Sequence, residues 1–538
     1  MNEEPVKKQN FLQGTMILAL GTIIVKVLGL LYKVPLNNTV GVLGNSYFNT
    51  AYKVYDVLLM ISTTGLPVAM SRMISQAQTL ENYAQIRKIY RTALRVFLCI
   101  GLVGMLGMAV FCRQLSVMVT TDTSSWAAIL ALSPCVLLVC LVSAYRGFFQ
   151  GQTNMTPTSV SQIFESLCRL VFGLGLAWII MKKANNPIYA AAGAICGVTI
   201  GSLVSALYLR ANFKRSSAIL SRAGGTAKST RDTMKELLAI AVPITLGAAG
   251  LQLINLFDTI IFMRRLRFAL SYTAEQANYL KGIYDFQLTV FAMPCALIMP
   301  ITISAIPNIT AALTRKDPAA AKQTEESALR VMSLIAAPCT VGLFFMSAPI
   351  VRLMCTQYTA DDVQLGGIIL SILGLAVIFD AMVLVLNAFM QAHGDVTTPV
   401  INMLIGGILK VIINFFLVAV PSLNIIGAPI GTLLCYACIA VLDLIAMRRS
   451  VQTKPAVFRN IVRPLVASIL MGVATFLIYR VLETALGSAK LACLAALAAA
   501  VVIYCVLVVF LRCLTYDDYM LLPKGEKIVK ILKIKENS

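Results

Sequence analysis

The chain has 538 residues, of which 58% are hydrophobic and only 13% are charged, and its formal net charge at pH 7 is +21. Soluble domains are about half apolar and about a quarter charged, so this composition excludes a water-soluble globular protein. The positive charge suggests nucleic acid, but the basic residues stand mostly in short segments between apolar runs. Membrane proteins fix their orientation in this way, so we expect no nucleic-acid partner.

Apolar runs of about twenty residues, the length that crosses a bilayer, recur along the whole chain. The first run follows Lys7 and Lys8 and has no small-residue cleavage site, which predicts a first span rather than a signal peptide. We predict about fourteen spans, near residues 12–35, 48–73, 92–112, 126–149, 157–181, 188–209, 236–262, 284–311, 328–352, 364–390, 399–420, 425–446, 461–482 and 489–513.

The connections after even-numbered spans carry more Lys and Arg than those after odd-numbered spans. By the positive-inside rule, this pattern predicts a multi-pass protein of the cell membrane with both termini in the cytoplasm. One connection does not fit the rule: residues 263–283 contain Arg264, Arg265, Arg267 and Lys281.

A basic linker separates two halves that resemble each other. Gln150 corresponds to Gln391 and Arg169 to Lys410 at one common offset, which indicates a duplication. Equivalent spans run in the same direction, so we predict an all-α membrane protein with two six-helix lobes related by a parallel pseudo-twofold repeat, plus two C-terminal helices. The predicted parts are an N-terminal lobe (1–209), a cytoplasmic linker (210–235), a C-terminal lobe (236–450), two additional helices (451–513) and a basic cytoplasmic tail (514–538).

Charged residues inside the spans point to transport. Each charge at a helix centre costs about 2.5–3.5 kcal/mol if it faces lipid, so these side chains must face protein or water. A cationic cavity in the first lobe, beside an apolar second lobe, suits an amphiphile with an anionic head. The candidate substrate-binding residues are Lys26, Lys33, Lys53, Arg72, Arg146 and Arg169.

A structural reading of the same charges stays open. Arg72 and Arg146 stand near span ends, where long side chains reach toward water. Glu165 lies one helical turn before Arg169, a spacing that allows an ion pair. Lys53 and Asp56 could pair in the same way. Lys26 has no acid within a turn.

Three segments carry a family resemblance: KVLGLLYKVPL (26–36), STTGLPVAMSRMIS (62–75) and YRGFFQGQTNMTPTSVSQ (145–162). They resemble the polysaccharide-biosynthesis branch of the multidrug/oligosaccharidyl-lipid/polysaccharide (MOP) exporter superfamily, and in particular its stage V sporulation protein B group and its lipid II flippases. The resemblance covers the whole chain. It implies a monomeric flippase that carries an undecaprenyl-diphosphate-linked peptidoglycan precursor, or a related lipid-linked oligosaccharide, by alternating access in cell-wall or spore-cortex synthesis.

The resemblance also implies roles for single residues. Lys26 and Lys53 fall on basic positions that line the cavity of relatives. Asp258 and Asn414 roughly match a sodium site of some relatives, but Val418 stands where that site has a second acid, and Lys410 is nearby. Coupling to sodium, to protons or to the membrane potential therefore stays open.

Other function classes have less support. No nucleotide-binding or catalytic motif is found, so we expect neither an ATPase nor an enzyme. A membrane glycosyltransferase or polymerase would have large acidic outward loops, which the sequence lacks. A MATE-like drug exporter would have an acidic cavity, whereas the spans of the first lobe are basic. Most of the fourteen cysteines, including the one CxxC pair Cys435 and Cys438, lie inside apolar runs, and there is a single histidine, His393, so we expect no metal and no cofactor.

Overall fold

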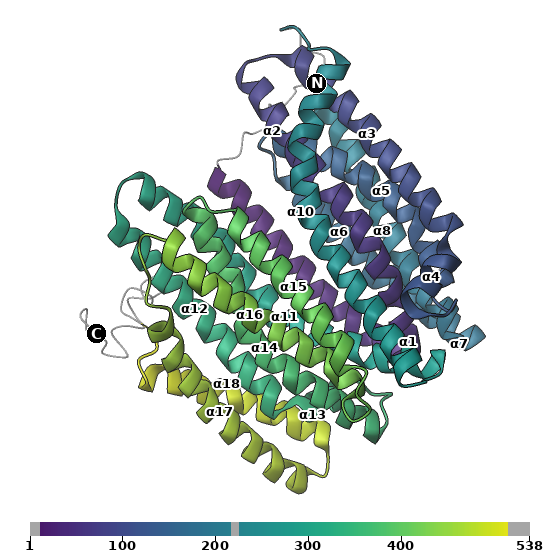
Figure 1. Cartoon of the computed structure of the whole chain (residues 1–538), viewed down its shortest axis with the longest axis vertical. Helices are drawn as coiled ribbons and strands as arrows, with labels where there is room; N and C mark the ends of the chain where they lie inside the picture. Colours follow the sequence, from purple (N-terminus) through teal and green to yellow (C-terminus); the bar gives the residue numbers. More distant parts are fainter. Residues whose placement is uncertain (1–10, 217–224, 515–538) are drawn as a thin grey trace. The chain divides into compact units, whose positions relative to one another are not determined.

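The computed structural model of the chain describes residues 11–216 and 225–514, and every regular element within these ranges is helical (Figure 1). The expected all-helical fold class is therefore confirmed. The predictions for residues 1–10, for residues 217–224 of the linker and for residues 515–538 of the tail lie outside the described residues.

Contacts divide the chain into two compact units, Met1–Asp285 and Phe286–Ser538. The boundary lies inside α11 (Ala274–Thr314). The other elements of the first unit are α1 (Phe11–Thr63), α2 (Gly65–Thr79), α3 (Tyr83–Val110), α4 (Cys112–Thr120), α5 (Trp126–Gly151), α6 (Thr156–Cys168), η1 (Arg169–Gly173), α7 (Leu174–Ala184), α8 (Pro187–Ser216), α10 (Thr230–Arg264) and η2 (Arg265–Ala269).

The second unit continues from α11. Its other elements are α12 (Pro318–Phe345), α13 (Ser347–Met354), α14 (Ala360–Ala392), α15 (Thr397–Leu417), η3 (Asn424–Ile426), α16 (Gly427–Ser450), α17 (Val457–Leu486) and α18 (Ala489–Phe510). The predicted lobes 1–209 and 236–450 differ from these units because α10 packs on α1, α2 and α3. The lobe assignment, which rests on the repeat, stays a prediction.

The described residues contain 13 helical segments long and apolar enough to cross a membrane. The first of them, Leu20–Thr79, has 60 residues and covers the predicted span 48–73 and most of the predicted span 12–35. As helix it would be about 90 Å long, which is more than twice what a bilayer core requires. At Gly41, φ is 71° and the chain leaves helical geometry, so α1 divides there into two parts. The chain is thus a multi-pass membrane protein.

Helix starts follow from local chemistry. The Asn82 side chain accepts a hydrogen bond from the Gln85 amide at the start of α3, and the Asp317 side chain accepts one from Ala320 at the start of α12. Thr359 forms a capping box with α14. These caps satisfy backbone N–H groups that have no partner within the helix.

The two units repeat one packing scheme. In the first, α5 contacts α3 and α8, while in the second α14 contacts α12 and α16. Large exposed apolar side chains, such as Val103 on α3 and Val501 on α18, cover the outer helices, as expected where lipid replaces water.

The helix-ending turns of the two halves match in detail. After α5, Thr153 has φ of 57°, and the Asn154 amide donates to Phe149 O at 3.0 Å. After α14, Gly394 has φ of 95°, and the Asp395 amide donates to Met390 O at 2.9 Å. These residues share the offset of Gln150 and Gln391, so the backbone repeats together with the sequence motif.

Gly65 permits a close approach between two helices. The helix is interrupted at Thr64, between α1 and α2. A Cβ atom on Gly65 would lie only 2.2 Å from Ala241 O in α10. No side chain fits at that distance. The glycine at this break therefore allows α2 to pack directly on the backbone of α10.

Candidate functional site

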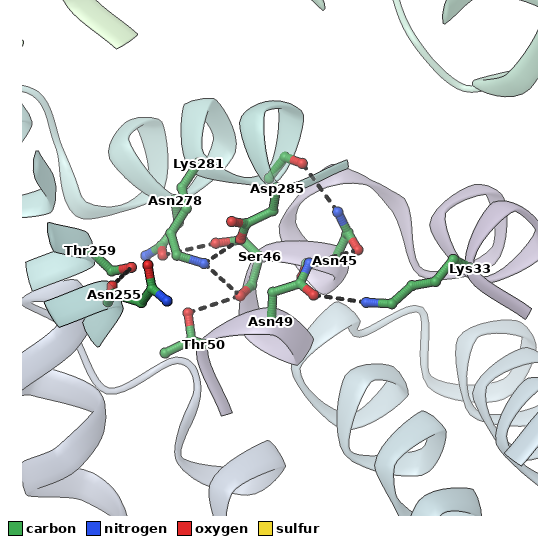
Figure 2. Close-up of polar contacts among 11 residues, drawn as sticks. Lys33, Asn45, Ser46, Asn49, Thr50, Asn255, Thr259, Asn278, Lys281 and Asp285 are labelled. Carbon is green, nitrogen blue, oxygen red and sulfur yellow. Dashed lines mark hydrogen bonds and ion pairs between the residues drawn. The ribbon is translucent and has the colours of Figure 1, made fainter. Parts of the chain in front are cut away.

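Lys33 lies in α1 before the division at Gly41, and residues after the division hold its ammonium group. Nζ donates to Asn49 Oδ1 at 2.8 Å and lies 4.4 Å from the centre of the Phe48 ring (Figure 2). Both partners are neutral, so these contacts orient the cation without neutralising its charge.

A buried polar network connects α1 to the first turns of α11 within the first unit. Lys281 Nζ donates to Asp285 Oδ2 at 2.5 Å and to Ser46 O at 3.2 Å (Figure 2). The side chains of Lys281 and Asp285 are 0% and 5% exposed. Asn45 Nδ2 donates to the carbonyl oxygen of Gly282 at 3.1 Å. The residues after the Gly41 division are thus fixed against α11.

Asn278 extends this network to the connection before α5. It accepts a hydrogen bond from Ser46 Oγ at 3.2 Å and donates from Nδ2 to Asp122 Oδ2 at 2.9 Å. Buried polar groups are costly unless each finds a partner, so this chain of bonds favours one arrangement of α1 and α11.

Two arginines, Arg146 on α5 and Arg169 at the start of η1, share the carboxylate of Glu165 on α6. Arg146 Nη2 lies 3.3 Å from Glu165 Oε2, and Arg169 Nη2 lies 3.7 Å from Glu165 Oε1. Arg146 Nε also donates to Ser161 Oγ at 3.0 Å. Arg169 begins the π-helical turn η1, and such turns are frequent at functional sites. One acid balances two cations, so this cluster keeps one positive charge.

The cluster opens on a cavity of about 340 Å³. Its walls include one face of α1, with Thr22, Val25 and Gly29, and the end of the second part of α1, with Leu59 and Thr63. The charged lining residues are Arg146, Glu165 and Arg169. The cavity is therefore apolar on the α1 side and basic on the side of α5, α6 and η1.

Aromatic rings connect the cavity to Lys33. The Tyr52 ring lies 5.9 Å from the Arg169 guanidinium and 5.8 Å from Lys33 Nζ. Asp56, one turn after Tyr52, is an electrostatic neighbour of Lys33, Lys53 and Arg169. Lys281 and Asp285 are also electrostatic neighbours of Lys33, so five cations face three carboxylates, Asp56, Glu165 and Asp285, in this part of the first unit. The excess of positive charge favours an anion.

The structure brings together four of the six candidate substrate-binding residues: Lys33, Lys53, Arg146 and Arg169. Lys26 lies on the same helix as Lys33, is exposed and is not among the lining residues of the cavity. Arg72 is exposed on α2, whose buried face is formed by other residues such as Met70 and Met73. It too lies outside the lining.

The two candidate coupling residues are buried in different units. Asp258 on α10 is 3% exposed, and Asn414 on α15 is 0% exposed. Asn414 packs against α16 at Gly431, where an added Cβ would lie 2.0 Å from Asn414 Oδ1. Their role as a cation site stays a prediction. Among the described residues, no group of three His, Cys, Asp or Glu side chains is placed to hold a metal ion.

Sequence reasoning missed the network between α1 and α11. The signal was present, because Lys281 belongs to the connection that does not fit the positive-inside rule. Two of its cations are engaged inside the protein: Lys281 with Asp285, and Arg267 with Thr121 Oγ1 at 3.0 Å and Tyr272 O at 2.6 Å. Both cations have partners inside the protein, which explains in part why this connection does not fit the positive-inside rule.

Comparisons with known proteins are consistent with this geometry. The family model described as polysaccharide biosynthesis protein matches residues 11–313, and the MatE model matches residues 283–416. The lipid II flippase MurJ of Bacillus subtilis is 27% identical, with 88% of this chain and 89% of MurJ covered. The stage V sporulation protein B of the same organism is 25% identical, with 79% and 81% covered.

Solved structures share the fold. A lipid II flippase MurJ in an inward closed conformation has a TM-score of 0.68 at 14% identity, covering 92% of this chain and 99% of that chain. An inward-facing multidrug resistance MATE family transporter of the MOP superfamily has a TM-score of 0.64 at 13% identity, covering 80% and 97%.

Proposed function

The chain belongs to the polysaccharide biosynthesis protein family of the MOP superfamily, and we propose that it is a flippase for a lipid-linked diphosphate. Its relatives are transporters, and the chain is a transporter rather than an enzyme. The finer substrate that we propose is an undecaprenyl-diphosphate-linked peptidoglycan precursor, or a related lipid-linked oligosaccharide, used in cell-wall or spore-cortex synthesis.

The observation that carries this proposal is the uneven balance of charge in the first unit. Arg146 and Arg169 face Glu165, while Lys33 and Lys53 face Asp56. A diphosphate brings negative charges and several acceptor oxygens, which suit guanidinium and ammonium donors. The names of two curated relatives support the same reading, because one is a lipid II flippase and the other a sporulation protein.

Tyr52 lies between the two groups of basic residues. Its ring lies beside both Lys33 and Arg169. An anionic head could therefore pass from one cation to the next without leaving a basic environment. Transport would proceed by alternating access, and the buried network around Lys281 would hold α1 to α11 in one of its arrangements.

Coupling and orientation are part of the proposal. Energy would come from a sodium or proton gradient, from the membrane potential or from the gradient of the lipid itself, with Asp258 and Asn414 as coupling residues. The basic ends of the even-numbered spans support cytoplasmic termini. We expect a monomer surrounded by membrane lipids.

A MATE-like exporter of small cationic molecules is the alternative. The MatE match to residues 283–416 and the similarity to a MATE transporter favour it. The charge of the cavity opposes it, because a cationic drug would meet Arg146 and Arg169 with one acid between them.

Complementation tests the proposal. The wild-type chain is expected to restore growth when lipid II flipping is depleted, or cortex formation in a sporulation mutant, whereas Lys33→Met/Arg169→Gln is expected to fail at equal membrane abundance. The matched control is Arg315→Gln/Lys316→Gln, which removes the same charge from exposed positions between α11 and α12. Full rescue by the Lys33/Arg169 variant would reject the proposal.

A further inference from the structure

The connection between α16 and α17 borders a hollow in the second unit. The hollow has a volume of about 650 Å³ and lies between the last turns of α16, residues 454–456 and the first turn of α17. This volume is in the range of small-molecule sites and far exceeds that of a single water. It shares no lining residue with the charged cavity of the first unit.

Three cations surround the hollow. Arg448 lies in the last turn of α16, Lys454 in the connection and Arg459 in the first turn of α17. All three are exposed, and within the described ranges none forms an ion pair. No acid is among the lining residues. The hollow therefore has a local charge that an anion can neutralise.

The nearby acids are engaged elsewhere. Three hydrogen bonds fix the connection to α12 and to the turn after α14: Ser450 Oγ donates to Asp395 at 2.6 Å, Thr453 Oγ1 donates to Glu325, and the Ala456 amide donates to Glu326 at 3.2 Å. Glu325 also bonds His393 Nε2 at 2.8 Å. These bonds hold the connection in place, and each of the three acids accepts a hydrogen bond from it.

The backbone of the connection also has an uncommon conformation at one residue. Lys454 has φ of 46°, in the left-handed region that residues other than glycine rarely adopt. Ala456, the N-cap residue of α17, gives no side-chain cap, and its amide donates to Glu326 instead. The site is therefore held in a fixed form before any ligand arrives.

The remaining walls are apolar and exposed. Ile445 is 51% exposed and Phe458 is 64% exposed, and both line the hollow. The α16 helix ends here with Arg448 and Arg449 in its last turn, which by the positive-inside rule marks the cytoplasmic membrane boundary. Phosphate groups of anionic lipids lie at this depth, with their acyl chains directed into the bilayer.

We propose that this hollow binds an anionic glycerophospholipid of the cytoplasmic leaflet. The phosphate lies among Arg448, Lys454 and Arg459, and an acyl chain runs along Ile445 and Phe458. Basic hollows between membrane helices commonly hold acidic headgroups in this way. The lipid would connect α16 to α17 and so support the packing of the two C-terminal helices on the second unit.

Native mass spectrometry of the full chain in neutral detergent tests the proposal. The probes are phosphatidylglycerol and phosphatidylcholine with the same acyl chains. We expect wild-type protein to retain phosphatidylglycerol, and Arg448→Gln/Lys454→Gln/Arg459→Gln to bind it about 100-fold more weakly, since each basic residue near an anionic lipid contributes roughly fivefold. The control variant Arg315→Gln/Lys316→Gln/Lys322→Gln removes the same charge and is expected to bind as wild type.

Several outcomes would overturn the proposal. They are equal retention of phosphatidylcholine, an equal loss in the control variant, or displacement of the lipid by millimolar inorganic phosphate, which would indicate a site for soluble phosphate. Arg448→Lys/Arg459→Lys keeps the charge and is expected to keep lipid binding, which separates loss of the site from misfolding. The measurement uses no transport substrate, so its result does not depend on the proposed flippase activity.

Discussion

Replacing Asp285 with asparagine removes the carboxylate bonded to Lys281, while the lysine stays buried at 0% exposure. Breaking a buried ion pair from one side costs about 3–5 kcal/mol, because the remaining charge has lost its counter-ion. Lys281 still donates to Ser46 O at 3.2 Å, so we expect the lower end of that range. At about 2 °C per kcal/mol for a large domain, thermal unfolding in detergent should shift down by roughly 6 °C.

A second pair provides the matched control. Lys228 and Glu236 are 2.7 Å apart, but their side chains are 56% and 36% exposed. An exposed pair contributes about 0–1 kcal/mol, so Glu236→Gln should shift the unfolding temperature by about 2 °C or less.

The double variant Lys281→Met/Asp285→Leu tests the cause. It removes both charges, so we expect it to recover most of the loss seen in Asp285→Asn, because apolar replacement of a buried pair is often near neutral. A double variant as unstable as the single one would refute the reasoning, since the loss would then not come from an orphaned charge.

Two further predictions concern helix packing and pH. Gly65→Ala places a Cβ 2.2 Å from Ala241 O and should lower stability by about 1–3 kcal/mol, whereas Gly107→Ala, with nothing within 4 Å, should be neutral or stabilising by thermal unfolding. The hydrogen bond from Ser450 lowers the pKa of Asp395, so Ser450→Ala should destabilise the protein above the ordinary Asp pKa of about 3.9. That difference should disappear as the pH falls through the lowered pKa in wild type; a difference independent of pH would contradict it.

The spans were predictable because each is a long apolar run, and such runs need no knowledge of tertiary contacts. The same holds for Glu165 and Arg169, which are one helical turn apart and form a pair in the structure. The sequence could not show that Arg146, on another helix, shares the same carboxylate. That contact depends on how α5 packs against α6.

The network around Lys281 shows a second limit. Its partners Ser46 and Asn278 are far apart in the chain, and Asn and Ser give no strong signal inside apolar runs. Conversely, Lys26 and Arg72 had the same charge signal as Lys33 but are exposed, whereas Lys33 is half-buried and bonded to Asn49. Charge inside a predicted span thus identifies the helix, whereas packing decides which side chain joins the buried group of basic residues.

The most direct test of the central claim is the affinity of purified protein for a lipid-linked diphosphate. Lys33→Met and Arg169→Gln are suitable variants because neither leaves a buried acid without its counter-ion. Lys33 bonds a neutral amide, and Glu165 still pairs with Arg146 when Arg169 is replaced. A hydrogen bond to a charged group contributes about 1.5–3 kcal/mol, so each variant should bind about tenfold more weakly or worse, while Arg315→Gln/Lys316→Gln binds as wild type. Equal affinity of the wild-type protein and both variants would contradict an anionic head bound among these basic residues.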